Sequence, residues 1–228
     1  MRIHSKSKAF TLVELLVTVA IVSLLAAMFT PALSATREKA KQIKCLNNLK
    51  QIVLACSIYA QDNNGVFSMF DVTTPAEQYW ASRLYKKGYI KNSAVFACPS
   101  WPINSAASLS ASTYGLRDFR TPTEYIVGDW LSAPVVLHLY NLPDPANYHL
   151  FADSTYGPLY SPATVASKQS HILATTPSLS SHGIHPRHNG TASVAFADGH
   201  AECCDTARLK AIGFAGGMNK DVSATVTY

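Results

Sequence analysis

Charged residues are scarce in this chain of 228 residues, at 14% against about 25% in an average soluble domain. Apolar residues make up 48%, which excludes a disordered protein or a coiled coil. Three of the 19 basic residues, Arg2, Lys6 and Lys8, lie in the first nine positions, and the remaining 16 stand against 14 acidic residues, a formal charge of +2. We therefore expect no nucleic-acid partner.

Motifs of common enzymes are also missing. The chain contains no Gly-x-Ser-x-Gly, no His-Glu-x-x-His and no phosphate-binding loop. Serine and histidine are plentiful, but no pair with the order or spacing of a base and a nucleophile is visible. We expect that the protein is not an enzyme, with no catalytic residue and no cofactor.

One long apolar run is present, from Phe10 to Leu33, and Glu14 is its sole charged residue. As a helix, these 24 residues reach about 36 Å, which is enough to cross a hydrocarbon core of about 30 Å. The preceding residues 1–9 form a short basic leader, which the positive-inside rule places in the cytoplasm. We expect a single-pass protein of the cytoplasmic (inner) membrane, with the rest of the chain outside.

A secretory signal peptide, a plain signal anchor and a buried soluble helix are the other interpretations of this run. A signal peptide has an uncharged apolar core of about 7–15 residues, shorter than this one. A plain anchor explains the length but not the acid, and a soluble helix needs no basic leader. Each of these three interpretations fails to explain either the presence of Glu14 in the apolar run or the basic leader before it.

Glu14 needs a partner, because a carboxylate inside a membrane span is costly. No Lys, Arg or His lies between Ala9 and Ser34. The partner must therefore come from another molecule or from a new amino terminus made by proteolysis nearby.

The residues around this acid, at 8–16, read Lys-Ala-Phe-Thr-Leu-Val-Glu-Leu-Leu. They resemble the processing motif of type IV prepilins and of the pseudopilins of type II secretion. The resemblance implies cleavage by prepilin peptidase between Ala9 and Phe10, N-methylation of Phe10, and filament assembly through Glu14. The chain departs from the family in having Ala9 where glycine usually precedes the cut.

The resemblance also implies a function, that of a structural subunit of a type II secretion pseudopilus or a type IV pilus-like filament. The implied partners are further copies of the chain, other pseudopilins, prepilin peptidase and an inner-membrane assembly platform. The assembled filament would be periplasmic or at the cell surface. The alternative from another class is a membrane-anchored extracytoplasmic enzyme or metal-dependent binding module.

The chain divides into a leader (1–9), a transmembrane helix (10–33), an amphipathic continuation of that helix (34–61) and an extracytoplasmic head (62–228). The continuation carries an apolar stripe at 3-4-3-4 spacing, made of Leu46, Leu49, Val53, Cys56 and Ala60. The head reads as short strands and loops, with a strand expected at Ala94–Ala97 and helical pattern at Ala76–Lys86. We expect an α+β, pilin-like fold, in which the long helix packs on a mainly antiparallel sheet.

A C-terminal β-hairpin is expected around Asp198-Gly199, since Asp-Gly is a favoured pair for a type I′ turn. With His188 ten residues earlier, the stretch resembles the His-x9-Asp-Gly signature of many prepilin-like proteins, and Phe96–Pro99 resembles a Cys-Pro segment of the same group. We expect a structural role for His188, Asp198 and Gly199, through hydrogen bonds to loop backbone.

Two metal sites are conceivable alternatives to that structural role. Zn²⁺ would use histidines near Asp198, namely His182, His185, His188 and His200. Ca²⁺ would need convergence of three dispersed acids, namely Asp129, Asp153 and Asp198. The histidine spacing matches no known motif, so we assign no metal ligand.

The five cysteines are Cys45, Cys56, Cys98, Cys203 and Cys204. An oxidising compartment allows a disulfide, in which Cys203 or Cys204 would meet Cys98. Cys45 and Cys56 share a helix face but lie too far apart to bond each other. Buried free thiols are the default expectation for all five.

Overall fold

The computed structural model describes residues 11–101, 109, 113–120, 123–156, 169–176, 182–218 and 225–228. Residues 1–40 and residues 41–228 are two separately compact units. The expected cleavage site, Ala9–Phe10, lies outside the described residues.

One helix, α1 (Leu12–Asp62), begins in the first unit and ends in the second. By length and composition it can cross a membrane, and it is the one such helix in the described part of the chain. None of its apolar stretch is buried inside the structure. From Lys41 onward the helix is amphipathic, and Leu49, Ile52 and Cys56 are fully buried against the head.

The head contains short strands, which we give with their bounds: β1 (Val66–Phe70), β2 (Gly115–Arg117), β3 (Ile126–Val127), β4 (Val135–His138), β5 (His149–Ala152), β6 (Ser154–Tyr156), β7 (Ile172–Leu173), β8 (His182–Ile184), β9 (Ala192–Phe196), β10 (Ala201–Cys204), β11 (Gly216–Met218) and β12 (Thr225–Thr227). Its short helices are η1 (Pro75–Glu77), α2 (Trp80–Lys86), η2 (Ser93–Phe96), η3 (Leu139–Asn141) and α3 (Thr206–Ala211).

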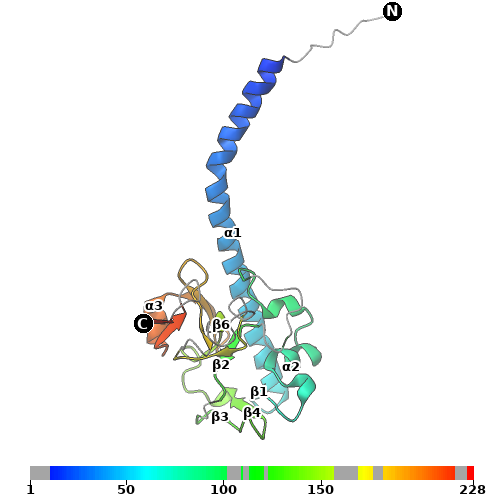
Figure 1. The fold of residues 1–228 in the computed structure, drawn as a ribbon. Helices are drawn as coiled ribbons and strands as arrows, with labels where there is room; N and C mark the ends of the chain where they lie inside the picture. The colour runs from blue at the N-terminus through cyan, green and yellow to red at the C-terminus, as the bar shows by residue number, and fades with distance from the viewer. Residues whose placement is uncertain are drawn as a thin grey trace, which may run out of the picture. The chain divides into compact units, whose positions relative to one another are not determined.

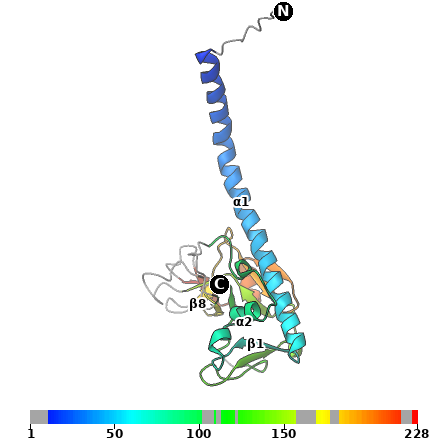
Figure 2. The same cartoon turned by 90° about the vertical axis from the view of Figure 1, so that its right-hand side faces the viewer.

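The strands form a five-stranded sheet in the order β10-β9-β5-β2-β7, a three-stranded sheet β1-β4-β3, and the pairs β11-β12 and β6-β8. Every named pairing is antiparallel except β2 with β7. Figure 1 shows the C-terminal part of α1 beside α2 and β1, and Figure 2 shows the same arrangement after a 90° turn. The α+β, pilin-like fold class is thus confirmed.

Aromatic side chains fill the core between α1 and the sheets. Phe151 on β5 has its ring 4.5 Å from that of Trp80 on α2 and 6.5 Å from that of Phe67 on β1. A second apolar cluster forms where α3 covers β9, and it includes Phe196, Leu209 and Phe214. The head therefore has an apolar core of its own, in two clusters.

Two local predictions are wrong. Ala94–Ala97 is not a strand, because the Asn92 side chain accepts a hydrogen bond from the Ala94 N–H at 3.0 Å and so starts the 3₁₀ helix η2. The helical pattern at Ala76–Lys86 is split into η1 and α2, since Tyr79 takes an extended conformation between them.

The turn at Asp198-Gly199 is not type I′. Gly199 has φ +98° while Asp198 stays outside the left-handed region, and the Gly199 N–H donates to the Phe196 carbonyl at 3.1 Å. Two consecutive positive φ values, as in a type I′ turn, occur instead at Asn64-Gly65 (57° and 82°) and at Asn189-Gly190 (52° and 84°). The second of these turns lies directly after His188.

Candidate functional site

The N-terminal end of α1 is closed by a capping box between Thr11 and Glu14. The Glu14 carboxylate accepts hydrogen bonds from the Thr11 N–H at 2.9 Å and from its hydroxyl at 2.8 Å. The Glu14 N–H donates to the Thr11 hydroxyl oxygen at 3.2 Å. The acid that lacks a cationic partner in its own span is therefore held at the helix N-terminus, where the helix dipole also favours it.

The sequence analysis did not consider Thr11, although the pattern Thr-x-x-Glu before an apolar run is the signature of a capping box. Both side chains are exposed, so the carboxylate is accessible to a second molecule. The described side chains from 11 to 40 are likewise exposed, apart from the half-buried Glu38.

A second site lies inside the head, where four potential metal ligands from distant segments meet. Cys45 is on α1, Cys98 follows η2, Asp153 joins β5 to β6, and His188 precedes the turn that leads into β9. Their ligand atoms all lie within 4.8 Å of one another. All four residues are at most 1% exposed. We call them the Cys–Asp–His cluster.

The contacts inside the Cys–Asp–His cluster are close. His188 Nε2 lies 3.3 Å from the Cys98 sulfur and 3.4 Å from Asp153 Oδ2. The Cys45 thiol is 3.4 Å from Asp153 Oδ1. The Tyr114 hydroxyl donates to the Cys45 sulfur at 3.1 Å.

Asp153 is ionised in the middle of this cluster. Burial by itself would raise the pKa of its carboxyl, but the Arg187 charge and hydrogen bonds from His188 and the Ser193 N–H hold that pKa far below its usual range. The Ser193 N–H donates to Asp153 Oδ2 at 2.9 Å, and Arg187 Nε lies 3.7 Å from Oδ1. Burial also works against a charged His188, but Asp153 and Cys98 raise the pKa of its imidazole.

The two thiols differ in acidity. Burial raises the pKa of Cys45 well above its usual value. Burial acts in the same direction on Cys98, but hydrogen bonds from Cys45 and His188 and the charge of Arg187 lower the pKa of Cys98 overall. The cluster thus favours negative charge on Cys98 beside a positively charged His188.

The structure brings His188 together with Cys45, Cys98 and Asp153, and not with the other histidines that the sequence suggested. His200 instead pairs with Asp198. The Oδ1 atom of Asp198 lies 2.6 Å from the His200 Nδ1 atom and also accepts a hydrogen bond from the backbone N–H of His200 at 3.0 Å. His182 Nδ1 lies 2.7 Å from the Ser170 hydroxyl, and the His185 ring lies 4.8 Å from that of Trp101. The suggested histidine group around Asp198 does not form in the described part of the chain.

The three acids suggested for Ca²⁺ do not converge either. Asp129 is exposed and accepts hydrogen bonds from its own loop, from the Leu131 N–H at 3.0 Å and the Ser132 hydroxyl at 2.6 Å. Asp198 caps its own turn, and Asp153 is buried in the Cys–Asp–His cluster.

All five cysteines are free thiols. Cys98 meets Cys45, and not Cys203 or Cys204, so the pairing suggested for a disulfide is wrong. Cys204 instead packs with Phe196 in the second apolar cluster. The sequence analysis missed Cys45 as a site residue, although it lies one helical turn before Leu49 on the buried face of α1.

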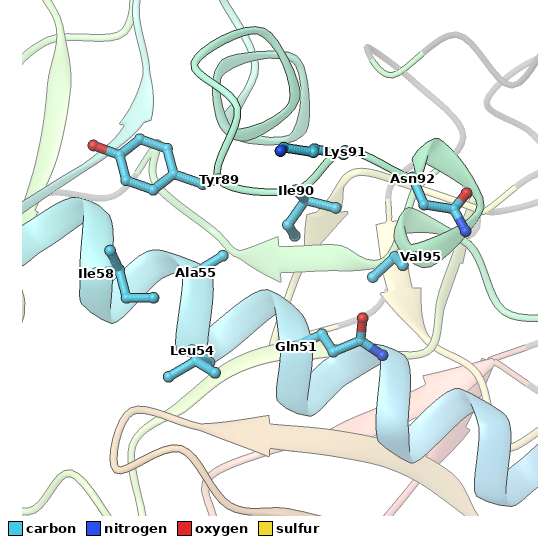
Figure 3. Close-up of a pocket in the computed structure, with 9 residues that line it drawn as sticks. All are labelled: Gln51, Leu54, Ala55, Ile58, Tyr89, Ile90, Lys91, Asn92 and Val95. Atoms are coloured by element: carbon cyan, nitrogen blue, oxygen red, sulfur yellow. The ribbon is translucent and has the colours of Figure 1, made fainter.

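A surface groove of about 350 Å³ lies between α1 and the segment that precedes η2 (Figure 3). Its nine lining residues are Gln51, Leu54, Ala55, Ile58, Tyr89, Ile90, Lys91, Asn92 and Val95. Lys91 is the sole ordinarily charged side chain among them, and no acid or imidazole accompanies it. The groove therefore offers an apolar surface and no acid–base chemistry.

Two comparisons relate parts of the chain to known proteins. Residues 4–30 match the family model described as the prokaryotic N-terminal methylation motif. The chain is 32% identical over 98 residues to the type II secretion system core protein G of Escherichia coli (strain K12). That match covers 40% of this chain and 66% of the relative, slightly less than two thirds of its length. No solved structure matches the chain.

These matches confirm the N-terminal part of the expected resemblance, while the His-x9-Asp-Gly stretch stays a prediction. The chain carries a prepilin-type N-terminal methylation motif on an apolar helix, and it is distantly homologous to a core protein of type II secretion.

Proposed function

We propose that this chain is a structural subunit of a type II secretion pseudopilus and not an enzyme. In this proposal prepilin peptidase cuts between Ala9 and Phe10, Phe10 is N-methylated, and α1 carries the subunit into the filament. Before assembly the protein spans the inner membrane once, with its leader in the cytoplasm and its head outside. Its partners are further copies of itself, other pseudopilins and the inner-membrane assembly platform.

The observation that carries the proposal is an exposed apolar helix beside a matched methylation motif. Leu12, Val13 and Met28 are 79%, 68% and 71% exposed. Removing such a side chain from water stabilises a protein by about 1.5–3 kcal/mol. Lipid before assembly, and the helices of neighbouring copies after it, are the surfaces that would cover this helix.

Glu14 gives the assembled helices a register. Thr11 holds the carboxylate at the N-terminal end of α1, which is the end where cleavage before Phe10 would create a new amine. A neighbouring subunit that presents its amine to this carboxylate would pair both charges away from water. Such a buried pair contributes little net stability but fixes one axial position, because any other register leaves a charge unpaired.

Similarity to the core protein G favours a secretion pseudopilus over a type IV pilus, which would use the same N-terminal features. In either filament we assign the C-terminal residues His188, Asp198 and Gly199 to the structure of the head. Asp198 and Gly199 close the hairpin turn, and His188 holds a buried polar contact.

Mass spectrometry of the mature N-terminus tests the proposal directly. Protein isolated from cells that express the secretion machinery should begin at an N-methylated Phe10. An intact Met1 under those conditions would exclude prepilin processing. Replacing Ala9 with glycine is the matched control, because it supplies the usual residue before the cut and should be processed at least as fully.

Assembly is tested with Glu14→Gln, which keeps the shape of the side chain and removes its charge. We expect loss of the variant from the sheared or cross-linked filament fraction, while its membrane level stays the same. Glu38→Gln, on the same helix beyond the apolar run, should assemble normally. Normal assembly of Glu14→Gln would contradict the role given to the charge.

A further inference from the structure

Nothing in the proposed filament function uses the Cys–Asp–His cluster, yet it is a fully buried group of polar side chains. Its members come from four segments, and the two farthest in sequence, Cys45 and His188, are 143 positions apart. Two sulfurs, an imidazole and a carboxylate rarely share one point of a protein core, because each is costly to bury without partners. From this convergence we propose that Cys45, Cys98, Asp153 and His188 form a structural Zn²⁺ site in the head.

The spacing of the ligand atoms fits tetrahedral coordination. Zn–S bonds of about 2.3 Å and Zn–N or Zn–O bonds of about 2.0–2.2 Å place neighbouring ligand atoms about 3.3–3.8 Å apart. The observed separations are 3.3 Å from Cys98 Sγ to His188 Nε2, 3.4 Å from His188 Nε2 to Asp153 Oδ2, and 3.7 Å from Cys45 Sγ to the same Asp153 Oδ2. An ion can therefore bind these four atoms with little movement of the side chains.

The ligand set selects zinc over the alkaline-earth ions. Thiolate and imidazole are ligands that Zn²⁺ accepts, whereas Ca²⁺ and Mg²⁺ require a shell of oxygen atoms. Four protein ligands also leave no open position for a substrate or an activated water. The site is thus of the structural kind, in agreement with a subunit that is not an enzyme.

The surroundings balance the charge of such a site. Two thiolates and one carboxylate carry three negative charges, and Zn²⁺ neutralises two of them. The buried Arg187 guanidinium supplies the third positive charge, with its Nε 3.7 Å from Asp153 Oδ1 and its side chain 3% exposed. The complete site is then electrically neutral, which a water-free interior requires.

Neighbouring groups also orient the ligands. The Ser100 hydroxyl lies 3.4 Å from His188 Nδ1, on the side of the ring opposite Nε2. The Ser193 N–H fixes Asp153, and the Tyr114 hydroxyl donates to the Cys45 sulfur, which suits a thiolate. Metal ligands in proteins are commonly held by such outer contacts.

Coordination would tie the helix to the sheet. Cys45 belongs to α1, while Asp153 follows β5 and His188 precedes β9, the two neighbouring strands at the middle of the five-stranded sheet. Polar side chains occupy this part of the core, so apolar packing does not hold α1 to the sheet here. Coordination of Zn²⁺ would stabilise that contact instead.

The test uses the full-length chain in detergent, purified under reducing conditions without chelator. We expect about one Zn²⁺ per chain by elemental mass spectrometry. Exchange of Zn²⁺ for Co²⁺ should produce the visible bands of tetrahedral Co²⁺ and a thiolate-to-Co²⁺ charge-transfer band. Because these bands are read on the wild-type protein, the test does not depend on whether any variant folds.

Variants then assign the ligands. Cys98→Ser should lower Zn²⁺ content at least about tenfold and remove half of the thiolate charge-transfer intensity of any Co²⁺ that remains. Cys56→Ser, which removes a fully buried thiol of α1 outside the cluster, should retain the metal. Chelation should lower the melting temperature of wild type and of Cys56→Ser.

Three outcomes would overturn the proposal. Wild-type protein that holds neither Zn²⁺ nor Co²⁺ has no such site. A Cys45–Cys98 disulfide in a non-reduced digest of protein isolated from cells would show that the two sulfurs serve a covalent link, which needs neither Asp153 nor His188. Full metal content in Cys98→Ser would place the ion elsewhere.

Discussion

Residues 12–40 and the head satisfy their polar groups in opposite ways. In the first unit the polar group that matters, the Glu14 carboxylate, finds its hydrogen bonds three residues away, at Thr11. In the head, Cys45 contacts Asp153 across 108 positions and Cys98 contacts His188 across 90. The first unit leaves its apolar side chains exposed, and the head buries even its charges. Local patterns therefore describe one unit, while long-range packing determines the other.

Core substitution should separate the two units most clearly. Phe151→Ala removes a fully buried ring that packs on Trp80 and Phe67, and we expect it to lower the free energy of unfolding of the head by about 3–5 kcal/mol. Leu24→Ala changes a side chain that is 66% exposed and should leave that free energy unchanged. Urea denaturation of the full-length chain in detergent, followed by tryptophan fluorescence, measures both. Equal effects would show that the two units unfold together.

Acid should destabilise the head through two buried histidines, His149 and His182, and the half-buried His171. Burial, aided by the Arg117 charge, lowers the pKa of His149 well below its usual value. Burial also lowers the pKa of His171 to about 3 and that of His182 to about 4, with contributions from neighbouring positive charges. These imidazoles stay neutral in the folded head but take up protons in the unfolded chain below about pH 6.5.

Stability should therefore fall as the pH drops below 6.5. Each histidine accounts for about 1.3 kcal/mol between pH 7 and pH 5.5, so the three together account for about 4 kcal/mol. Asp153 contributes nothing in this window, because an aspartate in the unfolded chain protonates only near pH 4. Where no metal is bound, His188 acts in the opposite direction, because its raised pKa keeps it protonated in the folded head while the unfolded chain gains that proton only as the pH falls through about 6.5. His149→Gln should reduce the pH dependence by about a third, and an unchanged dependence would show that this histidine is not buried neutral.

The sequence was informative where structure follows from neighbouring residues. The apolar run fixes α1, because its length and composition leave few alternatives to a membrane-spanning helix. The α+β class follows from one long helical stretch, a shorter helical pattern at Ala76–Lys86 and many short strands. The prediction of a strand at Ala94–Ala97 was wrong because the Asn92 side chain caps a helical turn there. The pattern of apolar residues does not reveal such a cap.

The buried cluster could not be predicted in the same way. The four residues show no fixed spacing in the sequence that would indicate a metal site. Asp153 and His188, for example, come together only when strands β5 and β9 pair. One local signal was available and overlooked: Asn189-Gly190, one of two Asn-Gly pairs in the chain, favours a type I′ turn and positions His188 at the end of its hairpin. Cys45 lies on the buried face of an amphipathic helix, where a cysteine is ordinarily a core residue. Its membership of a site becomes visible only when its position relative to the other three residues is known.

Capping residues should have small effects that stay within their own unit. The Asp205 side chain accepts a hydrogen bond from the Arg208 N–H at 2.9 Å and caps α3. Asp205→Ala should lower the free energy of unfolding of the head by about 1 kcal/mol. Thr11→Ala removes the other half of the Glu14 capping box, and it should speed amide hydrogen exchange in the first turn of α1 without changing unfolding of the head. A lower free energy of unfolding in Thr11→Ala would mean that the units are coupled through α1.

The smallest expected difference distinguishes the two hairpin turns. Asn189 has φ +52°, which alanine adopts only with strain, so Asn189→Ala should cost about 1 kcal/mol of head stability. Asp198 lies outside the left-handed region, and its carboxylate is partly exposed, so Asp198→Ala should cost less. If Asp198-Gly199 were the type I′ turn that its sequence suggests, the order of the two effects would reverse. Because Asn189 directly follows His188, repeating both measurements after chelation would show whether bound metal adds to the loss in Asn189→Ala.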